Sequence, residues 1–183
     1  MYIVAVAALF FLAFAFFAVG QASVVRNSAQ TAADASALAA ARSARDDVKD
    51  AFNKALIEGD LSQLGDLLAG AGMNGAGACE AAATMAVANH ADRQICDRTD
   101  DPPGYTVGVR TQGTVGKSVI DGTENKHALA NATAVVEPRC TVRQKDGKAI
   151  KFSCNGGEDV SVDPTANGFR LDLSLFFTVH LSK

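Results

Sequence analysis

The first 25 residues of this 183-residue chain contain no charged side chain. A helix rises about 1.5 Å per residue, so a run of that length can cross a hydrocarbon core of about 30 Å. No Lys or Arg precedes the run, and the basic start of an ordinary signal peptide is therefore missing. The sequence predicts a transmembrane or filament-core helix over residues 1–25, with the true start upstream or a leader already removed.

A second interpretation of the same run is a cleaved signal peptide. The small residues from Ala18 to Ala22 could form a signal-peptidase site, and a plain secreted domain would then begin near residue 20. The apolar run is longer than the core of a usual signal peptide, so we favour a helix that is retained.

An excess of charge of either sign is also missing from the chain. The 17 basic and 20 acidic residues are mixed along it and give a net charge of −3, which excludes the basic surface typical of nucleic-acid binding. His90, His127 and His180 belong to no metal or catalytic-triad motif, and the glycine clusters lack the lysine of a phosphate loop. We expect no catalytic residue, no cofactor and no metal, and hence no enzyme.

The four cysteines form no C-x2-C pair, which argues against zinc. Their even number, after an export-type segment, predicts two disulfides and an oxidising compartment. Cys140 and Cys154 flank the turn at Asp146 and Gly147 almost symmetrically, so we expect them to pair across a hairpin. That leaves Cys79 and Cys96, whose bridge would join a helix to a sheet.

Glycine and proline are absent from residues 26–57, where strong helix formers dominate. The pattern predicts an alanine-rich helical stalk, exposed and continuous with the apolar helix. Small side chains recur on one helical face and would let a second helix approach closely, and apolar positions in the first segment would pack in the same assembly. The alternative is that the alanines pack against the chain's own domain. The small residues on the shared face are Ala29, Ala33, Ala37 and Ala41. The apolar positions expected to pack in the assembly are Phe10, Phe14 and Phe17.

A carboxylate lies among these small residues. Asp34 could pair with Arg26 or Arg42 of a neighbouring helix, and ordinary solvation is the alternative. If Ala33 and Ala37 mark a close helix contact, replacing them with Leu should disrupt assembly and spare domain folding.

Residues 58–183 predict an extracytoplasmic α+β domain with short helices and an antiparallel sheet. The last segment alternates apolar residues on one face, as expected of a central strand. Residues 97–104, rich in Asp and Pro, predict a turn. The expected helices are Asp60–Ala69 and Cys79–Asp92, joined by a flexible connection at Gly70–Ala78, and the expected later strands are Ala128–Val136, Cys140–Gln144, Ala149–Ser153 and Phe169–Leu181.

Several polar positions add a family resemblance to this outline. Arg26-Asn27, Gln30, Ala33-Asp34-Ala35, Ala37-Leu38-Ala39 and Ala41 resemble the N-terminal signature of TadE/TadG-like proteins of tight-adherence (Flp, type IVc) pilus systems. The apolar lead is similar to the membrane segment of such proteins from high-GC Gram-positive bacteria. The resemblance covers about the first 45 residues. It implies a subunit or assembly factor of a surface filament, which an assembly ATPase and platform extract from the membrane.

One position departs from the pilin pattern. Pilins usually carry Glu at the fifth mature position, and Ala5 stands there if Met1 is the mature start. We expect a structural subunit, a pilin or minor pilin, that contacts copies of itself, other pilins, the assembly machinery and, before assembly, the bilayer. Its place would be the cytoplasmic membrane, with the C-terminal domain outside, or an extracellular filament. The alternative is a single-pass anchored binding or assembly module that never enters a filament.

Overall fold

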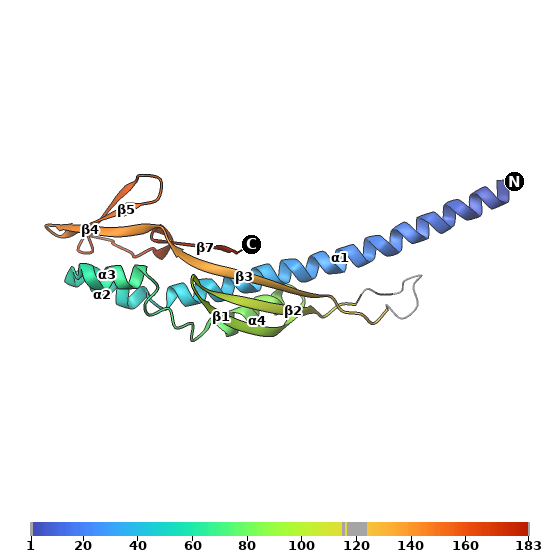
Figure 1. Cartoon of the computed structure of the whole chain (residues 1–183), viewed down its shortest axis with the longest axis horizontal. Helices are drawn as coiled ribbons and strands as arrows, with labels where there is room; N and C mark the ends of the chain where they lie inside the picture. Colours follow the sequence, from blue (N-terminus) through green and yellow to red (C-terminus); the bar gives the residue numbers. More distant parts are fainter. Residues whose placement is uncertain (1, 115, 117–123, 183) are drawn as a thin grey trace.

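A computed structural model of the chain describes residues 2–114, 116 and 124–182. Its longest element is helix α1, Tyr2–Asp46, of 45 residues. The first half of α1 extends away from the rest of the molecule and the second half lies within it (Figure 1). The expected long N-terminal helix is confirmed from Tyr2 onward; Met1 lies outside the described residues.

The helical path continues beyond α1 after a short turn. Helix α2, Lys49–Glu58, begins after this two-residue turn. The segment 26–57, which was expected to be helical, is therefore helical except at Asp47 and Val48. Val48 is buried in the core, which holds the turn in place. Gly59 ends α2 in a left-handed conformation, with φ of 70°, that glycine adopts without steric cost.

Two shorter helices follow. Helix α3, Leu61–Leu68, begins where the Asp60 carboxylate accepts a hydrogen bond from the Gln63 backbone N–H at 3.0 Å. Helix α4, Ala78–Ala88, lies where the sequence predicted a helix from Cys79 to Asp92, but it ends four residues earlier. The chain turns at His90, whose φ is 56°, and enters a strand at Ala91.

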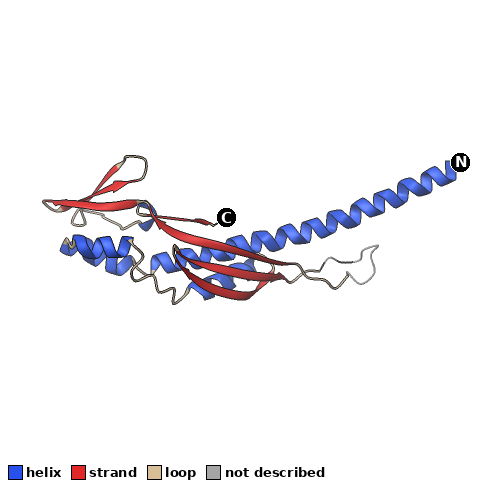
Figure 2. Cartoon of the chain, in the orientation of Figure 1, coloured by secondary structure: helices blue, strands red, loops and turns tan. Residues whose placement is uncertain are grey.

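The strands form two antiparallel sheets (Figure 2). The larger sheet has the order β1-β2-β3-β7 and packs against α1 and α4, while the smaller has the order β4-β5-β6 and lies beside α2 and α3 at the end opposite the N-terminus (Figure 1). The expected α+β class is confirmed. The strands are β1 Ala91–Asp100, β2 Pro103–Thr111, β3 Leu129–Pro138, β4 Cys140–Asp146, β5 Ala149–Cys154, β6 Asp159–Val162 and β7 Phe177–Leu181.

Two predicted segments differ from the structure. Residues 97–100, expected in a turn, extend β1, and the chain reverses only at Asp101 and Pro102. The long final strand predicted over Phe169–Leu181 is also wrong. Residues 169–181 instead form a loop, a 3₁₀ helix η1 at Leu173–Leu175, and the strand β7. In the larger sheet β7 is an edge strand and not a central one.

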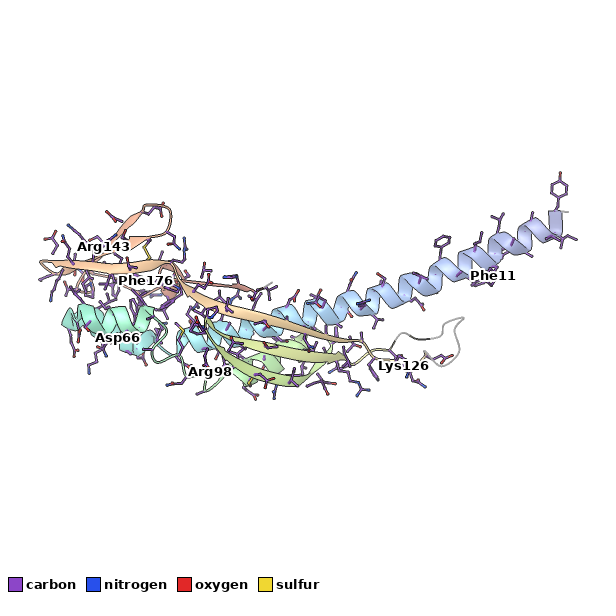
Figure 3. The ribbon with its side chains drawn as sticks, viewed as in Figure 1. Phe11, Asp66, Arg98, Lys126, Arg143 and Phe176 are labelled. Carbon is purple, nitrogen blue, oxygen red and sulfur yellow. A yellow bond between two sulfur atoms is a disulfide. The ribbon has the colours of Figure 1, made fainter. Side chains whose placement is uncertain are left out.

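The physical reason for the second difference lies in two consecutive phenylalanines. Phe176 and Phe177 are both buried, whereas neighbouring residues of a strand point to opposite faces. Phe176 instead packs between Phe52 of α2, at a ring-centroid distance of 4.9 Å, and Phe152 of β5, at 4.8 Å. This aromatic cluster joins the two sheets and α2 into one core. Phe176 is labelled in Figure 3.

Candidate functional site: the exposed half of helix α1

The first half of α1 holds most of the exposed apolar surface of the described residues. Thirteen of the twenty large apolar side chains that are exposed come from α1 between Tyr2 and Val24, so exposure is concentrated there and is not scattered over the domain. Figure 3 shows Phe11 on the part of α1 that extends away from the rest of the molecule. An exposed apolar surface of this extent requires lipid or protein around it.

The length and charge of this segment match a bilayer. Among the described residues, one helix is long and apolar enough to cross a membrane, and it begins at Tyr2. The first charged residue along it is Arg26, after which α1 enters the domain and alanines on one face become buried. The boundary between the apolar segment and the domain therefore coincides with the first charge.

The three phenylalanines expected to pack in an assembly lie in this exposed segment. Phe10, Phe14 and Phe17 are 63%, 60% and 63% exposed, respectively. Among the described residues, none of the three belongs to the core cluster or packs against it. Their role in assembly stays a prediction, and the structure leaves them available for it.

The alanine face lies elsewhere. Ala29, Ala33, Ala37 and Ala41 are fully buried, on the side of α1 that packs against α4, β2 and β3. This arrangement corresponds to the alternative in which the alanines contact the chain's own domain. The segment expected as an exposed stalk is helical, but one of its faces belongs to the core.

Asp34 lies at the edge of that face, partly exposed. Its carboxylate accepts a hydrogen bond from Gln30 Nε2 at 2.7 Å, and both line a notch of about 280 Å³ with Asn131, Thr133 and Ser182. Within the part of the chain that the structure describes, Asp34 forms no ion pair with an arginine. A neighbouring chain's cation as its partner stays a prediction.

Both predicted disulfides are confirmed. Cys79 of α4 is bonded to Cys96 of β1, and Cys140 is bonded to Cys154, its opposite residue in the β4–β5 ladder. The first bridge fixes a helix to the larger sheet and the second closes the base of a hairpin. Their positions make them structural links that stabilise the domain.

Sequence reasoning missed two polar residues of α1. Ser36 is fully buried beside the alanines, and its Oγ has no hydrogen-bond partner among the described residues. The Oε1 atom of Gln21, inside the apolar segment, is likewise buried without such a partner. Each is a polar residue within an otherwise small or apolar stretch, and that contrast in the sequence could have identified both.

Reactive side chains do not converge in the described residues. No group of three or more His, Cys, Asp or Glu that could hold a metal occurs among them. His127 Nδ1 lies 2.7 Å from the Thr111 carbonyl oxygen and His180 Nε2 lies 3.0 Å from the Glu137 carboxylate, at separate places on the larger sheet. The remaining hollows include one of about 530 Å³ between α2 and the loop before η1.

The fold and the exposed segment together define a class: an α+β domain with two disulfides, carried on one apolar helix that its own core leaves uncovered. A comparison with family models finds a match for the N-terminal segment. Residues 1–43 match the family described as putative Flp pilus-assembly TadE/G-like, which confirms the resemblance to TadE/TadG-like proteins of the Tad pilus system. No curated protein and no solved structure matches the chain.

Proposed function

We propose that this chain is a structural subunit, a pilin or minor pilin, of a Tad-type surface pilus and that it assembles through its N-terminal helix. The family match to residues 1–43 supports an association with such a pilus system. The observation that carries the finer proposal is the exposed apolar half of α1, which ends at the first charged residue and at the start of the domain. A filament subunit needs such an apolar segment both in the bilayer before assembly and in the filament core afterwards.

The physics of assembly follows from that surface. In the bilayer, Phe10, Phe14 and Phe17 contact lipid, and all backbone hydrogen bonds of the segment are satisfied within the helix. In a filament, the same side chains contact apolar helices of neighbouring subunits. Transfer between two apolar environments costs little hydrophobic free energy, so packing and polar contacts between helices decide the assembly.

The domain lies outside the cytoplasm in this proposal. Two disulfides are typical of proteins that fold in an oxidising compartment, and all four cysteines are paired. The chain then occupies the cytoplasmic membrane before assembly and the extracellular filament afterwards. Its partners are copies of itself, other pilins and the assembly machinery.

One observation favours a second candidate function. The alanine face that was expected to contact a neighbouring helix is covered by the chain's own domain. This leaves fewer positions for contacts between subunits outside the bilayer, as in a single-pass anchored module that takes part in assembly without entering the filament. Both candidates share the membrane helix and differ in where the mature chain is found.

Fractionation of native cells tests the proposal. The chain should be extracted by detergent and not by alkaline carbonate, and part of it should appear with filaments sheared from the surface. Phe10→Lys with Phe14→Lys should shift it to the carbonate-soluble fraction, because each ammonium at the centre of a span costs roughly 2.5–3.5 kcal/mol. Lys54→Ala, at an exposed position of α2, is the control and should change nothing. A wild-type chain that carbonate releases would contradict the membrane helix.

A further inference from the structure

Gln21 is a polar residue inside the segment that we place in the membrane. Its Oε1 atom is buried and has no hydrogen-bond partner among the described residues. In hydrocarbon there is no water to serve that atom, and an amide without a partner there is costly. The helix therefore lacks a partner group at this position.

The surface next to Gln21 is open to a neighbour. A shallow hollow of about 750 Å³ runs along α1 here, and a side chain added at Gly20 would meet nothing within 4 Å. Because Gly20 has no side chain, a second helix can approach the α1 backbone closely at this point. The described residues that line the hollow are Ala13, Phe16, Phe17, Gly20, Gln21, Val24 and Val25.

The chain's own domain leaves this side of α1 free. Phe17, Val24 and Thr31 recur every seven residues, share one face and are all exposed, whereas the domain covers the face with Ala29 and Ala33. A seven-residue repeat is the spacing with which two helices pack in a left-handed supercoil. As far as the described residues show, a second helix can thus lie along α1 between Phe17 and Thr31 without meeting the domain.

We propose that a second copy of this chain packs along this face, with Gly20 at the closest approach. The Gln21 side chain, whose Oε1 atom is covered in the single chain, turns outward in this contact, and the Gln21 amides of the two copies hydrogen-bond to each other. The inference rests on the proposed function, because it requires the segment to be inserted in the bilayer. A carboxamide carries both a donor and an acceptor, so it is complementary to its own copy. Parallel copies inserted from the same side also bring residue 21 to the same depth.

Association of the full chain in lipid vesicles tests this contact. Donor- and acceptor-labelled copies should show energy transfer that grows with the protein-to-lipid ratio. Gln21→Leu should weaken association about 3- to 30-fold, the range expected for hydrogen bonds between membrane helices. Gly20→Leu should weaken it at least as much, and Gln21→Asn should restore part of it. Phe11→Leu, also in the apolar segment, is the matched control and should leave it unchanged.

The outcomes separate this inference from the proposed function, because insertion is measured in the same vesicles by resistance to carbonate. A chain that inserts and associates equally well with Gln21→Leu overturns the amide contact, as does one that stays monomeric at every ratio. Association that arises only when the other pilus components share the membrane assigns this face to a different subunit and overturns self-association. A chain that does not insert contradicts both.

Discussion

The Asp47 carboxylate accepts a hydrogen bond from the backbone N–H of Gly75 at 2.6 Å. Asp47 lies in the turn between α1 and α2, and Gly75 lies in the glycine-rich connection before α4. Twenty-eight residues separate the two partners in sequence. This contact therefore ties the connection, expected to be flexible, to the end of the long helix.

We predict that Asp47→Ala lowers the free energy of unfolding by about 1 kcal/mol, because the Gly75 N–H loses a charged acceptor at a partly exposed site. Hydrogen exchange should rise in the connection before α4 and not in the smaller sheet. Glu158→Ala, an exposed carboxylate outside the helices, serves as the control in urea unfolding. Equal stability of the two variants would contradict a specific role for the contact.

The buried alanines lead to a second prediction. Ala33→Leu and Ala37→Leu should each destabilise the domain by roughly 1–3 kcal/mol, because extra methyl groups overpack a filled core. This replaces the earlier expectation that such variants spare folding. Ala35→Leu, on a partly exposed position of the same helix, should cost far less in thermal unfolding. Normal stability with Leu at 33 and 37 would show that the domain does not cover this face in solution.

A pair of titratable side chains connects β7 to β3. His180 Nε2 lies 3.0 Å from Glu137 Oε2, and this hydrogen bond, with a smaller contribution from the Leu181 carbonyl, raises the pKa of His180 above its ordinary value of 6.5. A raised pKa means that the folded state favours the protonated form. The stabilisation is therefore fully present below the unfolded pKa and is lost as the pH rises through the higher folded value.

We predict that Glu137→Gln lowers the pKa of His180, because the carboxylate that favours the imidazolium is removed. Both side chains are well exposed, so the effect on stability should be small, and it should disappear once the pH rises above the folded pKa of His180. An NMR titration of the His180 ring protons measures the shift, and Glu158→Gln is the control. An unchanged titration of His180 in Glu137→Gln would show that the pair is not formed in solution.

The two disulfides should stabilise different regions. Each closes a loop of 14 to 17 residues, for which the chain-entropy model gives about 3 kcal/mol. Replacing Cys79 and Cys96 with Ser should raise hydrogen exchange in α4 and β1, and the same change at Cys140 and Cys154 should raise it in β4 and β5. Identical exchange patterns for the two double variants would contradict this separation.

The helices and the disulfides could be predicted from local sequence. The charge-free run and the lack of Gly and Pro over residues 26–57 each specify structure within a few residues of themselves. The Cys140–Cys154 pair was predictable because a single hairpin turn sets both partners in register. The extent of β1 was not, since its Asp97–Asp100 end is held by pairing with β2.

The remaining misses depend on contacts between distant residues. The alternating pattern of the last segment suits a strand, yet Phe176 is drawn into a cluster with Phe52 and Phe152 that no local pattern reveals. The alanine spacing marks a close helix contact but does not say whether the partner lies in the same chain. Only the folded chain shows that α4 and the sheet occupy that face.

Cryo-electron microscopy of filaments sheared from the native cell surface, with mass spectrometry of the same material, tests the central claim most directly. We predict that this chain is present in the filament, with residues 2–25 of α1 in the filament core and the disulfide-linked domain outside. Intact filaments that lack the chain, with all of it left in the membrane fraction, would contradict the subunit proposal and favour the anchored module.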